Sequence, residues 1–301
     1  MDTKYTYETK VRENDALRAS FNELTQKTFW FNFEDWYTKK HWQDKYIPHV
    51  LSYDGKVVSN VSVNRMKYAV NGEIKNFIQI GTVMTDEEYR GQGLNRYIME
   101  QIMEEYKGKV DGIYLFGNDS VLNYYPKFGF LPSKEYAYSK KISGEATDTY
   151  EIQKVNAQNP EEWQKLYQAV CRWNAPEVAV KNQNDGFALC DNVGLYFFWL
   201  ESEFRESIYY VPEAECYVVA DADGAKLNLY QIFGEKKLDE VRFARSLCVD
   251  AKELALHYTP KDKKGYEVTE YQEEDCTFFI LGEDLKMVED RKLRFSVMSH
   301  A

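Results

Sequence analysis

The stretch from Thr82 to Leu94, TVMTDEEYRGQGL, constrains the fold of this chain more than any other. An apolar, β-branched run ends here at a short acidic loop, and Arg90-Gly91-Gln92-Gly93 then opens a segment of helical period. A strand, a glycine turn and a helix N-terminus in this order can hold phosphate, because the first amides of a helix lack intrahelical partners and carry partial positive charge. The stretch therefore predicts a nucleotide-type site.

The two glycines alone are equally compatible with an ordinary tight turn. The pattern is not a P-loop, since no Gly-Lys-Ser/Thr follows, and it lacks the three spaced glycines of the dinucleotide fingerprint. Arg90 precedes the glycines, whereas a dinucleotide site has an acidic ribose ligand after them.

A second segment, Asn118 to Phe130, follows another apolar strand and reads NDSVLNYYPKFGF. Together with Arg90 and Gly93, its Tyr125–Phe130 run resembles the GCN5-related N-acetyltransferase (GNAT) superfamily. The motifs of that family are R/Q-x-x-G-x-G/A after the fourth strand and Tyr-x-Lys-x-Gly-Phe after the fifth. Asn95 departs from the small residue that usually ends the first motif. The resemblance covers residues 5–142.

The resemblance implies an α/β (α+β) fold, the GNAT acyl-CoA N-acyltransferase fold, with a mixed central sheet flanked by helices. It implies acetyl-CoA as cosubstrate, with the pantetheine arm paired to the free edge of the fourth strand and the pyrophosphate on the glycine turn. The coenzyme contacts that it implies are Val83, Met84, Thr85, Arg90, Gly91, Gln92, Gly93, Leu94, Asn95, Arg96 and Asn118. Helix capping is an equal alternative for Asn118.

Tyr125 is the candidate catalytic residue, because it lies five residues before Phe130, where the resembled family has its general acid. A phenol with a pKa of about 10 is neutral at pH 7 and can protonate a leaving thiolate. The alternative is an ordinary buried aromatic in a chain with 24 tyrosines. Residues 1–145 contain no cysteine, so we expect direct transfer in a ternary complex and no covalent acetyl-enzyme. The general base stays open among Glu34, Asp35, His41 acting through water, and the terminal carboxylate of Ala301.

An aromatic stretch that begins at Phe29 lies where the substrate-side helix of such a fold would be. The candidate acceptor contacts in it are Trp30, Phe31, Glu34, Asp35 and Trp36. This stretch forms either ordinary core or an aromatic-lined amine pocket with the two carboxylates at its mouth. The expected acceptor is a primary amine of a small molecule or peptide, with a cationic amine as one form.

The expected elements follow from hairpin signals and periodicity. Asp54-Gly55 and Asn71-Gly72 separate strands at 46–53, 56–70 and 73–85. Helices are expected from Asn14, at 91–106 and at 119–128, with further strands at 112–116 and 136–142.

The polar segment 141–148 is the predicted linker between two domains, 1–145 and 146–301. After it the order of elements repeats without visible sequence identity, which resembles tandem acetyltransferases of the enhanced-intracellular-survival type. The second copy is predicted to be degenerate, because Phe233-Gly234-Glu235 places an acidic residue where the first copy has its glycine turn. We expect no coenzyme there.

Charge is unevenly divided along the chain. Residues 1–145 hold 20 basic and 20 acidic residues and residues 146–301 hold 18 and 29, so the net charge of −11 belongs to the second half. This balance disfavours nucleic acid. It indicates either a solvated acidic surface or attraction of a cationic amine by clusters such as Glu273-Glu274-Asp275.

Further features bound the setting. No apolar run approaches the roughly 18 residues of a membrane span and no signal-peptide core is present, so we expect a cytoplasmic protein without membrane contact. The five cysteines are widely spaced, which favours isolated thiols over disulfides or a metal site. An oligomer stays open.

These patterns predict an acetyl-CoA-dependent N-acetyltransferase. Two alternatives remain: a transferase of a larger acyl group, and a non-catalytic acyl-CoA-binding or regulatory protein.

Overall fold

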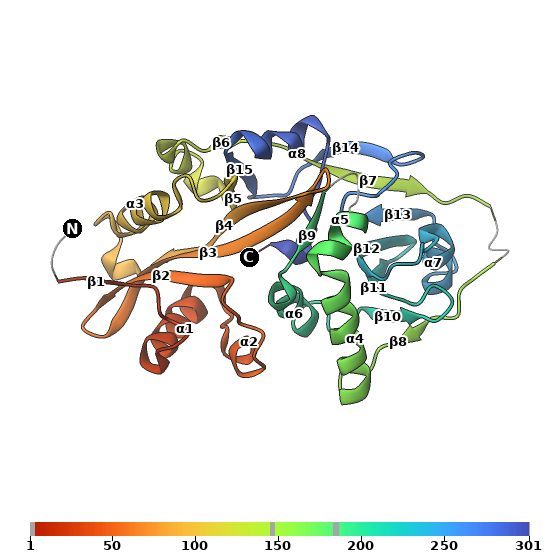
Figure 1. Cartoon of the computed structure of the whole chain (residues 1–301), viewed down its shortest axis with the longest axis horizontal. Coiled ribbons are helices and arrows are strands. Elements are labelled where there is room, and N and C mark those ends of the chain that lie inside the picture. Colours follow the sequence, from red (N-terminus) through yellow and green to blue (C-terminus); the bar gives the residue numbers. More distant parts are fainter. Residues whose placement is uncertain (1–3, 145–147, 183–186, 301) are drawn as a thin grey trace.

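The computed structural model describes residues 4–144, 148–182 and 187–300, which form two mixed sheets with helices around them (Figure 1). The first sheet has the strand order β1-β2-β3-β4-β5-β15-β6, with β9 paired to β3. The second has the order β14-β7-β13-β12-β11-β10-β8. In Figure 1 the first sheet lies on the left and the second on the right.

The first half of the chain supplies most of the first sheet. Its strands are β1 (Thr6–Glu8), β2 (Tyr46–Tyr53), β3 (Lys56–Val70), β4 (Glu73–Thr85), β5 (Gly112–Gly117), β6 (Leu131–Pro132) and β7 (Glu135–Lys141). Its helices are α1 (Asp15–Phe29), α2 (Glu34–Thr38) and α3 (Leu94–Tyr106), with 3-10 turns at Glu87–Tyr89, Asp119–Val121 and Tyr125–Phe128. The three long strands have the expected bounds, whereas the helix expected at 119–128 is two separate 3-10 turns.

The second half repeats this organisation. Its strands are β8 (Gln153–Lys154), β9 (Phe187–Cys190), β10 (Ile208–Val211), β11 (Cys216–Asp223), β12 (Lys226–Phe233), β13 (Glu253–Leu256), β14 (Glu267–Tyr271) and β15 (Thr277–Leu281). Its helices are α4 (Pro160–Trp173), α5 (Pro176–Asn182), α6 (Val193–Glu201), α7 (Glu240–Leu247) and α8 (Met287–Asp290), with 3-10 turns at Glu283–Lys286 and Val297–Ser299.

The two copies exchange one strand each. Strand β7, from the first half, pairs with β13 and β14 in the second sheet. Strand β15, from the second half, lies between β5 and β6 in the first sheet. The strand expected at 136–142 is therefore present as β7, but it belongs to the second sheet and not to the first. The boundary at residue 145 separates two stretches of sequence but not two sheets, and as a boundary between folding units it stays a prediction.

With the exchange taken into account, both sheets have the same order. Each sheet has a parallel central pair, β4–β5 in the first and β12–β13 in the second. The next strand outward is the exchanged one, β15 or β7, and the last is β6 or β14, which comes from the same half of the chain as the central pair. The expected repetition of topology is confirmed.

Helices α1 and α3 cover opposite faces of the first sheet. Asn14 caps α1 by accepting a hydrogen bond from the amide of Leu17, as the sequence predicts. Buried Phe21 of α1 and Ile98 of α3 belong to separate apolar cores, one on each face. A third core, which includes Tyr68, Tyr114 and Phe295, fills the space between the two sheets.

Two sequence expectations concern the chain as a whole. In the described ranges, no helix is at once long and apolar enough to cross a bilayer. All five cysteines are free thiols, as expected, and Cys190 and Cys216 are buried.

Candidate active site

Strands β4 and β5 pair in parallel only as far as Ile80 and Leu115, and then diverge. Strand β4 continues to Thr85, still paired on its other side with β3. Within the described residues, the edge of Val83, Met84 and Thr85 that faces β5 has no strand partner. An opening therefore lies between the two strands, and one of its walls is a strand edge without a strand partner.

A β-bulge marks the point of divergence. Thr82 has a φ of +47°, and the register with β3 shifts between Asn60 and Ser62. A β-branched residue in this conformation is strained by about 1–3 kcal/mol and persists only where its surroundings fix it. Here the buried Asn60 amide donates to the Thr82 carbonyl at 2.7 Å, and the hydroxyls of Tyr46 and Thr82 lie 2.6 Å apart.

The glycine turn leads into α3. Gly91 and Gly93 have φ values of +76° and +74°, and a methyl group added to either would meet no atom within 4 Å. Gly93 is the N-cap of α3 and supplies no side chain to its amides. The exposed Arg90 donates through Nε to the Thr85 carbonyl at 3.3 Å. An anion can therefore approach amides that have no helical partner, beside a guanidinium group.

The other residues of the turn have structural contacts. Asn95 accepts a hydrogen bond from the Ser59 hydroxyl through Oδ1, which ties the first turn of α3 to β3 and explains a polar residue at this position. Gln92 accepts from Tyr5 at 2.7 Å. Leu94 is buried in the core beneath α3, and the exposed Arg96 pairs with Glu100 at 2.9 Å.

Tyr125 begins the second of the two 3-10 turns after β5 and is buried. Its ring packs against Phe130 and against Phe279 of the exchanged strand β15, with ring centroids 6.0 and 5.5 Å apart. A methyl group on Gly117 would lie 3.0 Å from the ring, so glycine at the end of β5 gives the ring its place. Burial raises the pKa of the Tyr125 phenol, which is therefore protonated at neutral pH.

Asn118 lies at the end of β5 and is exposed. Its side chain accepts from the Ser120 hydroxyl and makes no hydrogen bond to a capped amide. The neighbouring amide of Asp119 donates to Asp275 at 2.7 Å, so the acidic cluster 273–275 lies beside this loop.

A cavity of about 540 Å³ lies at the bulge. Its walls come from α1, α2, β2, β4, α6 and the C-terminal segment. The lining residues are Phe29, Phe31, Asn32, Phe33, Trp36, Tyr46, Thr82, Leu195, Phe198, Trp199, Ser202, Glu203 and His300. Thr82 thus belongs both to this cavity and to the point where β4 leaves β5.

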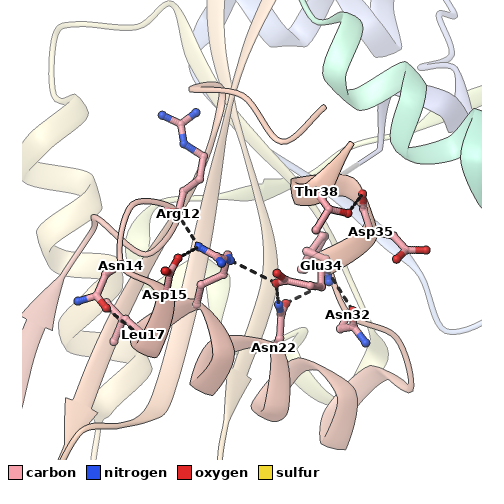
Figure 2. Close-up of polar contacts among 11 residues, drawn as sticks. Arg12, Asn14, Asp15, Leu17, Asn22, Asn32, Glu34, Asp35 and Thr38 are labelled. Carbon is pink, nitrogen blue, oxygen red and sulfur yellow. Dashed lines mark hydrogen bonds and ion pairs between the residues drawn. The ribbon is translucent and has the colours of Figure 1, made fainter. Parts of the chain in front are cut away.

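Of the five candidate acceptor contacts, Phe31 and Trp36 line the cavity, and Trp30, Glu34 and Asp35 do not. Trp30 is 85% exposed. Glu34 accepts from Arg18 at 3.2 Å and from Asn22 at 2.9 Å, and Figure 2 shows the Asp35 carboxylate pointing away from Glu34. Neither carboxylate lines the cavity, since Glu34 joins α2 to α1 and Asp35 is exposed, and their place at the mouth of the pocket stays a prediction.

The open candidates for a general base are also placed. His41 stacks on Phe197 with ring centroids 4.6 Å apart and does not line the cavity. Ala301 lies outside the described residues.

Several lining residues escape sequence reasoning. Phe198, Trp199 and Glu203 come from α6 and the turn after it, in the half of the chain that carries neither of the two motifs. A signal exists: α6 reads VGLYFFWLE, apolar on every side, which indicates a helix with more than one buried face. His300 stacks on Phe116, and burial lowers its pKa to about 3, so its ring is neutral at pH 7.

The corresponding helix of the second copy is closed to an anion. Asp239 caps α7 by accepting from the amides of Val241 and Arg242 at 3.0 Å each. A methyl group on Gly234 would lie 2.4 Å from Cys216, so the turn packs against protein. A carboxylate therefore occupies the position of an anionic ligand.

Comparison with known proteins agrees with this geometry. Residues 5–132 match the family model described as Acetyltransferase (GNAT) domain. No curated protein matches the chain.

Solved structures of similar fold cover nearly the whole chain. A probable N-acyltransferase from Enterococcus faecalis aligns over 95% of this chain and 74% of its own, at 14% identity and a TM-score of 0.62. Eis1 from Mycobacterium abscessus aligns over 91% and 73%, at 10% identity and a TM-score of 0.54. A putative acetyltransferase from Pyrococcus horikoshii aligns over 100% and 97%, at 11% identity and a TM-score of 0.50. At these identities the likeness shows the fold.

Proposed function

We propose that the chain acetylates a primary amine directly in a ternary complex, as an acyltransferase that uses acetyl-CoA. Residues 5–132 match the GNAT acetyltransferase family model. One observation carries the proposal. Thr82 lines the cavity at the bulge and also lies where β4 separates from β5. A coenzyme in the opening and an amine in the cavity can therefore meet beside it.

The coenzyme side of this site is formed by the first copy. The free edge of Val83, Met84 and Thr85 suits the amide groups of a pantetheine arm, which can pair with it as an added strand does. The open turn of Gly91 to Gly93 suits a pyrophosphate. These residues fit the coenzyme, which supplies the activated acetyl thioester.

Tyr125 holds the proton that a departing thiolate needs. The register of the two strands supports this role. Ile80 and Leu115 are the last paired residues of β4 and β5, and Thr82 and Gly117 each lie two residues beyond them. The Tyr125 ring covers Gly117, so it lies at the level of Thr82 along the strands. In the transfer, the amine nitrogen bonds to the acetyl carbon and the carbon–sulfur bond breaks. The ammonium loses two protons, of which one ends on the thiol and the other in solvent.

The second copy contributes to the acceptor side. Leu195, Phe198, Trp199, Ser202 and Glu203 line the cavity, and the helix of this copy that corresponds to α3 is capped by its own aspartate. We propose that residues 146–301 bind no coenzyme and form one wall of the amine site. Asp275 lies beside Asp119 on the coenzyme side, so Glu203 replaces the cluster 273–275 as the acid that faces the acceptor.

Replacing Tyr125 by Phe tests the proposal. The ring and its packing persist, so coenzyme affinity should stay unchanged while kcat falls by roughly 10²–10⁴-fold, the usual contribution of a general acid. Tyr124→Phe is the matched control, because its buried hydroxyl has no hydrogen-bond partner in the described residues. Steady-state assays of thiol release should separate the two variants. Equal kcat for Tyr125→Phe and the parent, with chemistry rate-limiting, would reduce Tyr125 to a packing role.

A further inference from the structure

Among its described residues, the lining of the cavity at the bulge combines an apolar wall with one carboxylate, and this combination specifies an acceptor. We infer that the acceptor is a primary amine carried on a flat apolar body, such as an aromatic ring, with Glu203 as the partner of its ammonium group. The inference rests on the proposed acetyl transfer and adds the chemical class of the amine.

The walls favour a flat apolar group. Among the described lining residues, seven are aromatic other than histidine: Phe29, Phe31, Phe33, Trp36, Tyr46, Phe198 and Trp199. They come from both copies, and the rings of Phe31 and Phe33 contact Phe198 across the boundary at centroid distances of 6.0 and 5.7 Å. An aromatic body can make edge and offset contacts with such rings. The volume of about 540 Å³ lies within the range of small-molecule sites.

The same walls disfavour a polyhydroxylated acceptor. In the described part of the lining, the uncharged polar residues are Asn32, Thr82 and Ser202, apart from the tyrosine and the neutral histidine. The Tyr46 and Thr82 hydroxyls already bond to each other. Several hydroxyls of a sugar-like amine would lose water here without gaining enough partners.

The charged groups favour a cation. Glu203 is the one acidic residue in the described lining, and no lysine or arginine is among these residues. The pKa of His300 near 3 keeps its ring neutral, so it does not repel an ammonium group. A long acyl chain in the same cavity would gain nothing from the carboxylate, which favours an amine over the acyl-chain alternative.

A comparison of singly charged amines tests the inference. We expect kcat/KM for 2-phenylethylamine to exceed that for glucosamine by about 100-fold, the scale on which an apolar pocket discriminates. Phe198→Ala should raise the KM for 2-phenylethylamine about tenfold, a loss typical of an aromatic contact, and leave the KM for acetyl-CoA unchanged. The control is Tyr209→Ala, since Tyr209 is a half-buried aromatic residue of β10 outside the cavity.

The carboxylate is tested in the same way. Glu203→Gln should raise the KM for 2-phenylethylamine about three- to fivefold at low salt and less at high salt, as for an exposed ion pair. Glu206→Gln is the matched control, because this exposed glutamate pairs with Lys154 at 3.0 Å and does not line the cavity.

The outcomes separate the inference from the proposed function. Efficient acetylation of glucosamine and not of 2-phenylethylamine overturns the inference and leaves acetyl transfer standing. A preference for decanoyl-CoA over acetyl-CoA that Phe198→Ala abolishes also overturns it, because the cavity then holds the acyl chain.

If neither amine is acetylated although acetyl-CoA binds, the proposed function fails, and calorimetry decides the inference separately. Binding of 2-phenylethylamine to the full chain that weakens in Phe198→Ala supports the cavity as an amine site. Absence of binding overturns it.

Discussion

At the scale of single residues, the candidate site combines positions that a local motif reveals with positions that only tertiary contact reveals. Gly91, Gly93 and Tyr125 stand in motifs a few residues long, so the sequence predicts them. The contact of Asn95 with Ser59 and the support of Thr82 by Asn60 join residues more than 20 positions apart. No spacing rule indicates such pairs, and the polar type of Asn95 becomes intelligible only with its partner in place.

Gly93→Glu should weaken coenzyme binding by at least tenfold, about 1.4 kcal/mol, because a carboxylate would stand at the site of an anion. Gly93→Gln is the control, since it adds the same bulk and backbone strain at a φ of +74° without the charge. Calorimetry with coenzyme A should show a larger loss for glutamate than for glutamine. Retention of affinity within about threefold in both variants would place the coenzyme elsewhere, by the same affinity arithmetic.

At the scale of elements, hairpins are predictable and strand partners are not. The bounds of β2, β3 and β4 follow from turn signals, and Asp54 and Gly55 both have positive φ, as a two-residue hairpin requires. The exchange of β7 and β15 leaves no such local trace in the sequence. The alternation of apolar and polar residues in each strand is compatible with several different neighbouring strands, so it does not indicate the partner. Glu135, at the start of β7, is the one unusual residue in these two strands, because it is ionisable and fully buried.

Burial raises the pKa of Glu135 to about 7, although its carboxylate accepts from the Phe295 amide at 2.7 Å. In the unfolded chain this group ionises near its ordinary pKa of about 4.3. The folded state therefore holds the proton more tightly, and the stability that Glu135 contributes below that pKa is lost as the pH rises to about 7.

Glu135→Gln should remove this loss. The variant should gain on the order of 3 kcal/mol in unfolding free energy relative to the parent between pH 4.5 and pH 8, since each pKa unit corresponds to about 1.4 kcal/mol. Urea unfolding of both proteins at the two pH values measures the difference. A gap between the two proteins that does not change with pH would show that the carboxyl titrates normally.

At the scale of the whole molecule, the two copies depend on each other. Residues 1–145 contain β7, whose partners lie in the second sheet, and lack β15, whose Phe278, Phe279 and Ile280 are buried in the first. The cavity at the bulge likewise takes walls from both halves. The sequence predicts two copies from the order of elements but not their interdependence, because exchange leaves that order intact.

Residues 1–145 and 146–301 expressed separately should therefore show no cooperative unfolding and no acetyltransferase activity, because each leaves strand edges open. Expressed together, the two fragments should associate one to one and recover activity. Size-exclusion chromatography, circular dichroism and the thiol-release assay measure this. Acetylation of the same amines by residues 1–145 alone, at the efficiency of the whole chain, would contradict both the shared cavity and the exchange.

The late position of β15 also has a consequence for synthesis on the ribosome. Strands β5 and β6 leave the ribosome about 160 and about 145 residues before the strand that lies between them. At the usual 5–20 residues per second, the nascent chain waits roughly 7–30 s with that gap unfilled. During this interval the edge of β5 can pair with any other extended chain nearby, so the yield of native protein in the cell should depend on translation speed and on the chaperones that shield it.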